Sequence, residues 1–305
     1  EGRELQSTPL REVSQLSIYG NAYITIPTLK ELMQRGIPVC YFSFGGWFYG
    51  ISKGLTHKNV ELRIAQYKTA TDTSASLKLS RSFVKGKIEN CRTMLRRNDK
   101  EIRESFLDRL SHLAEKAKTA RKPQTLLGIE GAAAQTYFSR FDNLLKTGGI
   151  FKFKNRNKRP PKDPVNAVLS YLYGVLVKEW FVTLLTVGFD PYLGFFHSPK
   201  YGRPSLALDM MEEFRPLIAD SVTLTLFNNG QLKKNDFIKT GIGVSLKSRA
   251  KKTIIRGYER RMDTEITHPL FGYQVSYRRV LEVQARLLSR TLLGEIESYP
   301  PFCTR

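Results

Sequence analysis

Apolar residues alternate with polar ones near the start of the chain. Within residues 1–54, this alternation, the aromatic residues and several glycines predict short strands joined by turns. The expected strands cover 13–18, 23–26, 38–44 and 47–50, and one short helix covers 28–34. This part of the chain is therefore predicted to be a small β-rich domain.

Beyond the β-rich part, apolar positions recur every three or four residues, which is the period of one helix face. Clear stripes run over 84–95 and 102–113. The stretch 165–187 is apolar enough to suggest a membrane span, but Lys178 and Glu179 interrupt it. Because both charges are costly in the bilayer centre, we interpret this stretch as a buried pair of helices.

The two periods divide the chain into two domains. Residues 71–76 carry no large apolar side chain and are predicted to form a hinge. We expect an α+β protein, in which residues 1–70 form an N-terminal β-rich domain with a short helix and a linker. Residues 71–305 are expected to form a large all-α catalytic domain.

The net charge of the chain is the composition feature that says most about its function. The chain has 49 Lys and Arg residues against 28 Asp and Glu residues, a formal net charge of +21. Such an excess repels itself in a folded protein and is typical of proteins that bind a polyanion, most often nucleic acid. An anionic membrane surface is the main alternative, and a basic surface without a polyanion is another.

Two regions concentrate the positive charge. Residues 151–162 hold six Lys and Arg residues, no acid, and enough Pro and Asn to predict a mobile loop. A second cluster lies within 239–290, and clustered cations favour phosphate contact through counterion release. The predicted nucleic-acid contacts, with the ordinary solvated helix face as the alternative, are Lys152, Lys154, Arg156, Lys158, Arg159, Arg203, Lys247, Arg249, Lys251, Lys252 and Arg256.

The cysteines and the first residues bear on compartment and completeness. Cys40, Cys91 and Cys303 are far apart and odd in number, so we expect neither a disulfide framework nor a cysteine zinc site. A reducing prokaryotic cytoplasm fits this pattern. The chain begins with neither a signal peptide nor Met, which suggests a piece of a longer protein.

One of the four histidines stands out, because His112 lies within a predicted helix and is interpreted as structural, and His57 and His268 lie near turns with no acid cluster nearby. His197 ends an aromatic run and enters a turn-rich loop before a predicted helix over 205–214, which Pro216 is expected to end. On that helix Asp209 lies three residues before Glu212 and four before Glu213, so these carboxylates share a face. The group is either a solvated acidic face or a set that needs a divalent cation.

A third acid completes the candidate chemistry. Glu130 is flanked by glycine and alanine, which allow a backbone or a phosphate to come close. The alternative is tight helix packing, with Glu130 favoured by the dipole at a helix start. Two carboxylates and one histidine would suit Mg²⁺ or Mn²⁺ with positions left open for water and phosphate oxygens.

Four motifs taken together resemble a known family. They are GIEGAAAQTYF (128–138), DPVNAVLSYLYGVL (163–176), GFDPYLGFFH (188–197) and YGRPSLALDMMEEFRP (201–216). The chain resembles the adaptation integrases of CRISPR systems, the first-numbered CRISPR-associated protein family, over nearly its whole length. The resemblance implies metal ligands at Glu130, His197 and Glu212 and a supporting acid at Asp209. Glu212 replaces an Asp that some relatives have, and Glu213 is the less favoured ligand.

The resemblance also implies an activity and an assembly. The family is a homodimer whose copies clamp a dimer of a small ferredoxin-like partner, giving a heterohexamer. The assembly carries a prespacer duplex whose 3′-hydroxyls attack the CRISPR repeat beside the leader. The family's first strands are missing before Pro9, and some relatives are fused to a RecB-like iron–sulfur nuclease. The implied function is a metal-dependent DNA integrase and endonuclease working by transesterification.

Two other functions remain open from the sequence. A stand-alone metal-dependent nuclease would use the same residues with water as the nucleophile. A catalytically silent DNA-binding scaffold would keep a steep salt dependence of binding, but substitution of Glu130 would change no activity. Membrane-surface binding is the most remote alternative.

Overall fold

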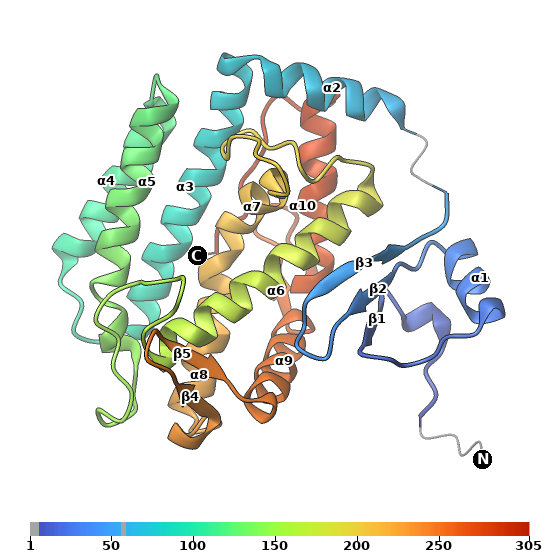
Figure 1. Ribbon diagram of the computed structural model, residues 1–305. Helices are drawn as coiled ribbons and strands as arrows, with labels where there is room; N and C mark the ends of the chain where they lie inside the picture. Colours follow the sequence, from blue (N-terminus) through green and yellow to red (C-terminus); the bar gives the residue numbers. More distant parts are fainter. Residues whose placement is uncertain (1–5, 56–58, 305) are drawn as a thin grey trace. The chain divides into compact units, whose positions relative to one another are not determined.

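The computed structural model describes residues 6–55 and 59–304 (Figure 1). The chain divides into two compact units, residues 1–58 and residues 59–305. This boundary lies twelve residues before the predicted one at 70, because the helix that follows residue 59 belongs to the second unit. His57 lies outside the described residues.

The first unit is a three-stranded sheet with one α-helix. Parallel pairing joins β1 (Leu16–Tyr19) to β2 (Val39–Phe42), and β2 pairs antiparallel with β3 (Phe48–Ser52). Between the parallel strands runs α1 (Ile26–Gln34). The strand predicted over 23–26 is wrong, because Thr25 accepts a hydrogen bond from the Thr28 N–H and so caps α1.

The second unit is helical, with two short antiparallel ribbons. Its elements in chain order are α2 (Val60–Thr71), α3 (Thr73–Asn98), α4 (Glu104–Thr119), α5 (Pro123–Phe138), α6 (Pro164–Val187), α7 (Ser205–Met211), α8 (Ser221–Asn228), β4 (Phe237–Lys239), β5 (Val244–Leu246), α9 (Ser248–Met262), β6 (Glu265–Thr267), β7 (Gln274–Ser276) and α10 (Tyr277–Leu292). Helices α3, α4 and α5 pack on one another, and α6 packs on α7 and α10 (Figure 1). The predicted fold class, a small β-rich part followed by a large helical part, is confirmed.

The hinge predicted over 71–76 is wrong. Helix α2 ends at Thr71 and α3 begins at Thr73, so that only Asp72 separates them. The Asp72 carboxylate accepts the N–H groups of Ser74 and Ala75, which satisfies two donors at the start of α3. Small polar residues that look like a linker are here the first turn of a capped helix.

Helix α6 forms one continuous helix, and not the predicted helix pair. Asp163 caps its start by accepting the Asn166 N–H, and Gly188, with φ of 112°, ends it. The helix is long and apolar enough to cross a membrane by length and composition alone. Many of its apolar side chains, among them Trp180 and Leu172, are fully buried in the core of the second unit.

Pro216 does not end the helix that starts at Ser205. After α7 the chain continues as a 3-10 turn (Glu212–Phe214) and a π-helical turn (Arg215–Asp220), and then as α8. A proline has no N–H, and its ring collides with the carbonyl four residues earlier in a regular α-helix. The change of hydrogen-bond spacing around Pro216 accommodates both problems, so the chain stays helical through the site.

The basic loop 151–162 is fixed to the core, which corrects the expected mobile arm. Phe151 and Phe153 are buried in the main core. Asn166 of α6 holds the next part, because its side-chain carbonyl accepts the Asn157 N–H at 3.0 Å and its amide donates to the Asn155 carbonyl at 2.8 Å. The loop is therefore a rigid basic surface.

The segment 299–304 packs against the 3-10 turn through a buried acid. Glu213 accepts the Phe302 N–H at 2.7 Å and a hydrogen bond from the Tyr299 hydroxyl at 3.3 Å. Asn90 of α3 donates to the carbonyls of Glu213 and Phe302. Burial raises the pKa of Glu213 to about 8, and the hydrogen bonds from Phe302 and Tyr299 only partly oppose this.

This burial predicts a pH-dependent stability. The folded-state pKa of Glu213 exceeds the value of about 4.3 for an exposed glutamate. The protonated carboxyl group therefore contributes to the free energy of unfolding at low pH. The contribution is lost as the pH rises from about 4 through 8. Glu213→Gln should therefore gain stability relative to the wild type across this range and level off above it, as measured by urea-unfolding midpoints from pH 5 to 9.

Glu61 provides the matched control, since it is an exposed glutamate in α2. Glu61→Gln should follow the wild-type pH profile throughout. Parallel profiles for Glu213→Gln and the wild type would contradict a protonated, buried Glu213.

Candidate active site

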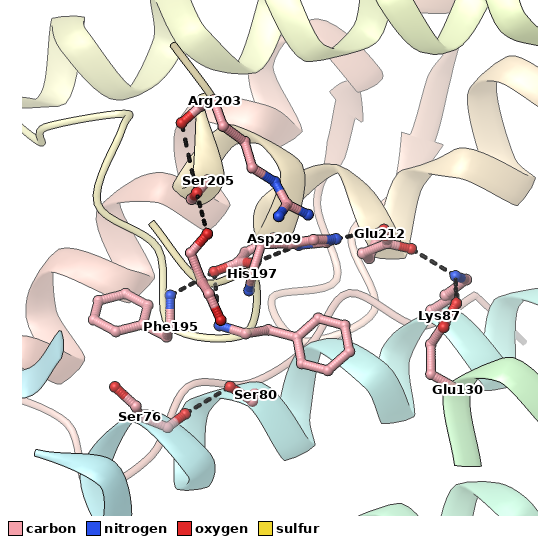
Figure 2. A network of polar contacts seen from close by, with 12 residues as sticks. Ser76, Ser80, Lys87, Glu130, Phe195, His197, Arg203, Ser205, Asp209 and Glu212 are labelled. Atoms are coloured by element: carbon pink, nitrogen blue, oxygen red, sulfur yellow. Dashed lines mark hydrogen bonds and ion pairs between the residues drawn. The ribbon is translucent and has the colours of Figure 1, made fainter. Parts of the chain in front are cut away.

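A single buried carboxylate organises the loop that carries His197. Asp209 of α7 accepts the backbone N–H groups of Phe195 at 2.6 Å, Phe196 at 3.0 Å and His197 at 2.9 Å. It also lies 2.7 Å from Nδ1 of the His197 ring (Figure 2). Because a carboxylate only accepts hydrogen bonds, Nδ1 donates its proton to Asp209, and in the neutral ring the lone pair is then on Nε2.

Two further residues fix the same loop. A side chain at Gly194 would place its Cβ 2.6 Å from the Asp209 carboxylate and 2.7 Å from the Ser205 carbonyl carbon, so only glycine fits. Gln66 of α2 donates to the carbonyls of Asp190 and Leu193 and accepts the Asp190 N–H. The loop between α6 and α7 is therefore tied to both α7 and α2.

Glu212 faces the free nitrogen of His197. Its Oε1 atom lies 4.0 Å from His197 Nε2 and 3.1 Å from the Arg215 guanidinium. Burial alone would raise the pKa of Glu212, but Arg215, Lys87 and His197 outweigh it and lower the pKa to about 2. Glu212 is therefore an ionised carboxylate held in the protein interior.

Lys87 of α3 joins Glu212 to Glu130. Its ammonium forms ion pairs with Glu130 of α5 and with Glu212 Oε2, the latter at 2.7 Å (Figure 2). Burial opposes the charge of Lys87, but the two carboxylates outweigh it, and the pKa of Lys87 is raised. Glu130 lies in the middle of α5, which excludes the helix-start alternative.

Two of the three predicted metal ligands, Glu130 and Glu212, thus share an ammonium group, and the third, His197, faces Glu212. Within residues 6–55 and 59–304, no three His, Cys, Asp or Glu side chains lie together closely enough to hold a metal ion as they stand. The donor chemistry nevertheless suits Mg²⁺ or Mn²⁺, with one imidazole nitrogen and two carboxylates. Oxygens of Glu130 and Glu212 already contact one shared cation, the Lys87 ammonium.

The acids of this segment are not a solvated face. Asp209, Glu212 and Glu213 are each at most 2% exposed, which excludes that alternative. Glu212 and Glu213 are adjacent in sequence but contact different partners, because Glu213 binds the segment 299–304. The structure therefore places Glu213 outside the group of Glu130, His197 and Glu212.

Behind Glu212, two arginines lie over one tyrosine ring. The guanidinium carbons of Arg156 and Arg215 lie 5.2 and 4.8 Å from the centre of the Tyr173 ring. The Tyr173 hydroxyl donates to Asp220 at 2.7 Å, and the Tyr137 hydroxyl donates to its other oxygen at 2.9 Å. Burial raises the pKa of Asp220 to about 6, although both tyrosines and the arginines oppose this.

Most of the predicted DNA-contact residues are exposed, but the Arg156 guanidinium is already bound to other groups of the protein. Its guanidinium donates to Asn157, Asn166 and Ser170, so it fastens the basic loop to α6. Arg203 and Lys251 are partly buried. The exposed members are Lys152, Lys154, Lys158 and Arg159 in the loop and Lys247, Arg249, Lys252 and Arg256 around α9.

Lys158 connects the basic loop with the acid site. Burial lowers its pKa, and the nearby charges of Arg215, Arg156 and Arg159 lower it further, while Glu212 acts in the opposite direction. Lys158 therefore lies within electrostatic reach of Glu212 and Arg215. The loop brings an exposed cation toward the group of Glu130, His197 and Glu212.

Sequence reasoning missed Lys87 and Arg215. Lys87 lies three residues after Val84 and four before Cys91, so it falls on the apolar stripe of α3 that faces the core. A lysine on the buried face of a helix needs an acidic partner. That signal was present in the sequence, whereas the pairing of Arg215 with Glu212 depends on the irregular turns after α7.

Comparison with known proteins identifies the family. The family model described as CRISPR associated protein Cas1 matches residues 1–260. A CRISPR-associated exonuclease Cas4/endonuclease Cas1 fusion from Geobacter sulfurreducens is 49% identical over 97% of this chain and 55% of its own length. A CRISPR-associated endonuclease Cas1 from Thermus thermophilus is 42% identical over 100% of this chain and 90% of its own length.

Solved structures show the same fold. A Cas1 protein from Thermotoga maritima superposes with a TM-score of 0.78 at 25% identity, covering 94% of this chain and 88% of that one. A Cas6-RT-Cas1–Cas2 complex superposes with a TM-score of 0.74 at 25% identity, covering 97% of this chain and 32% of that one.

The fold is thus that of a family of CRISPR-associated proteins. The chain belongs to the Cas1 family. It spans about half the length of the fusion relatives that it matches, 55% and 54% for two of them.

The geometry of the His197 loop predicts that adding one methyl group at Gly194 lowers the stability of the protein. Gly194→Ala should destabilise the protein by roughly 1–3 kcal/mol, because the new Cβ would collide with Asp209 and Ser205. Urea unfolding followed by circular dichroism measures this change.

Gly174 in α6 is the matched control, since a Cβ there meets nothing within 4 Å. Gly174→Ala should be neutral or stabilise by up to about 1 kcal/mol, because alanine loses less entropy in a helix. Equal stability of the two variants would show that Gly194 is not confined by the carboxylate.

Proposed function

We propose that this chain is the metal-dependent DNA integrase and endonuclease of CRISPR adaptation. One observation carries the proposal: Glu130 and Glu212 share one buried ammonium group, and the His197 ring faces the other oxygen of Glu212. An N/O donor set next to exposed cations suits phosphodiester chemistry on a nucleic acid.

Each residue then has a role set by its contacts. Glu130, His197 and Glu212 would hold Mg²⁺ or Mn²⁺, which would polarise the phosphorus–oxygen bonds and stabilise the attacking and leaving oxygens. Asp209 keeps the Nδ1 proton on His197, so that Nε2 stays available. Arg215 keeps Glu212 ionised in the protein interior.

The nucleophile in this proposal is the 3′-hydroxyl of a prespacer duplex, which attacks a phosphodiester bond of the CRISPR repeat. One oxygen–phosphorus bond forms as another breaks, and the displaced 3′-oxygen leaves with a proton. Exposed cations of the loop 151–162 and of α9 would hold the phosphates of both duplexes. Lys158, whose charge interacts with that of Glu212, would be one of these contacts.

The proposed assembly has two interfaces. A homodimer through the first unit is supported by Phe44, Trp47 and Tyr49, whose side chains are 71–79% exposed. A small ferredoxin-like adaptation partner, completing a heterohexamer, is supported by the likeness to a chain of a complex that contains Cas2. A Cas4-type RecB-like exonuclease is a further proposed partner, since relatives carry one on the same chain. The proposed location is the prokaryotic cytoplasm.

The chemistry predicts strand transfer that depends on the metal. A labelled duplex incubated with a repeat-containing target should give joined products with Mn²⁺ or Mg²⁺ and none with a chelator. His197→Ala should reduce the rate at least 100-fold, because one ligand and the nitrogen facing Glu212 are lost. DNA affinity, measured by fluorescence anisotropy, should change less than threefold.

The same assay separates the alternatives. Cleaved products that form equally well without a 3′-hydroxyl donor would favour hydrolysis by water over integration. Unchanged product formation by both His197→Ala and Glu130→Ala would favour a catalytically silent DNA-binding scaffold.

The basic loop predicts a change in salt dependence. Lys152→Ala with Lys154→Ala should weaken duplex binding and reduce the slope of log affinity against log salt by about 2, one unit for each lost phosphate contact. Anisotropy titrations from 50 to 200 mM salt measure the slope. Lys116→Ala, an exposed site on α4, should leave it unchanged, and an unchanged slope in the double variant would remove the loop from the DNA surface.

A further inference from the structure

Lys87 is placed unusually for a lysine. It comes from the long helix α3, its side chain is only 9% exposed, and its ammonium contacts carboxylates of two other elements. Glu212 is 3% exposed and Glu130 is 19% exposed at the side chain, so water screens neither ion pair well. A lysine is long and flexible, and burying its charge needs this compensation.

The ammonium uses the atoms that a metal ion would need. It contacts Oε1 of Glu130 and Oε2 of Glu212, one oxygen from each proposed carboxylate ligand. Arg215 already takes the other oxygen of Glu212, at 3.1 Å. A divalent ion held by Glu130 and Glu212 would therefore compete with a positive charge that already contacts their oxygens.

The local charges also show what Lys87 does when no metal ion is bound. Glu130 and Glu212 approach each other from α5 and the 3-10 turn, and two carboxylates this close repel unless a cation separates them. Lys87 supplies that cation from a third element, so it fixes the spacing of the two acids within the folded chain.

We propose that Lys87 is a built-in counter-cation of the metal site, holding Glu130 and Glu212 together and competing with the divalent ion for their oxygens. This inference rests on the proposed function. It makes Lys87 a positioning residue that acts through the two carboxylates. Removing its charge should therefore strengthen metal binding while weakening the protein's stability when no metal is present.

The test is calorimetric titration of Mn²⁺ into the whole chain. Lys87→Met keeps the length of the side chain but removes its charge, and should bind Mn²⁺ at least tenfold more tightly than the wild type. Lys87→Arg keeps the charge and should not bind more tightly. Lys85→Met, two residues earlier on α3 and partly exposed, is the matched control and should bind like the wild type.

Thermal unfolding supplies a readout that is independent of catalysis. With a chelator present, Lys87→Met should unfold at a lower temperature than the wild type, because Glu130 and Glu212 lose their shared partner. Saturating Mn²⁺ should raise its midpoint by more than it raises the wild-type midpoint. A structural role alone would lower the midpoint without this larger recovery.

A further test observes Lys87 in the wild-type protein and uses a variant only to assign one resonance. With ¹³C-labelled lysine, the Lys87 ε-carbon resonance, identified by its absence from Lys87→Arg, should shift along the same binding curve as Mg²⁺ saturation. A resonance that does not move while Mg²⁺ binds would overturn the competition.

The outcomes separate the two proposals. Wild-type protein that binds no Mn²⁺ overturns the metal site and, with it, the role of Lys87. Wild-type binding with equal or weaker binding by Lys87→Met overturns the role of Lys87 alone and leaves the metal site standing.

Discussion

The Asp209 carboxylate accepts three consecutive backbone N–H groups and lies against an imidazole nitrogen, and none of it is exposed. Buried N–H groups that lose their acceptor cost about 1–3 kcal/mol each, so the conformation of the loop before α7 depends on this one side chain. The orientation of His197 follows from it, and with it the direction of the nitrogen that faces Glu212. The requirement for glycine at position 194 follows from the same close approach.

Charge balance is the second constraint on the site. Glu212 is shared between Lys87 and Arg215, and Arg215 also lies over the Tyr173 ring that Arg156 covers from the basic loop. Removing one member of a buried ionic group leaves the others uncompensated, which costs more than a surface ion pair contributes. The acid site and the basic loop are thus linked through stacked side chains.

The regular parts of the fold were predictable from the sequence, because apolar stripes reflect which helix face is buried. The stripe over 84–95 falls within α3, and the β-rich start falls within the first unit. Prediction failed where a single side chain determines the local backbone conformation. Asp72 caps a helix where a hinge was expected, and the irregular turns around Pro216 let the chain stay helical past the proline. Such outcomes depend on local hydrogen bonding, which periodicity does not record.

Motif reasoning singled out Glu130, His197, Asp209 and Glu212, and in the structure a chain of contacts that passes through Lys87 links these four residues. It did not single out Lys87, although a lysine on an apolar helix face needs an acidic partner. It also treated Arg156 as a phosphate ligand, since charge along a sequence does not reveal which way a guanidinium faces. The partners of Lys87 lie far away in the sequence, whereas those of Arg156 are nearby residues that the loop brings against α6.

The change from α-helical through 3-10 to π-helical spacing between Ser205 and Asn228 has an evolutionary consequence. Each residue added or removed there would rotate everything beyond it by about 100° around the helix axis. Glu212 and Glu213 would then exchange their separate surroundings, and Asp220 would leave its two tyrosines. Lineages of this protein should therefore vary this segment by replacing residues while conserving its length.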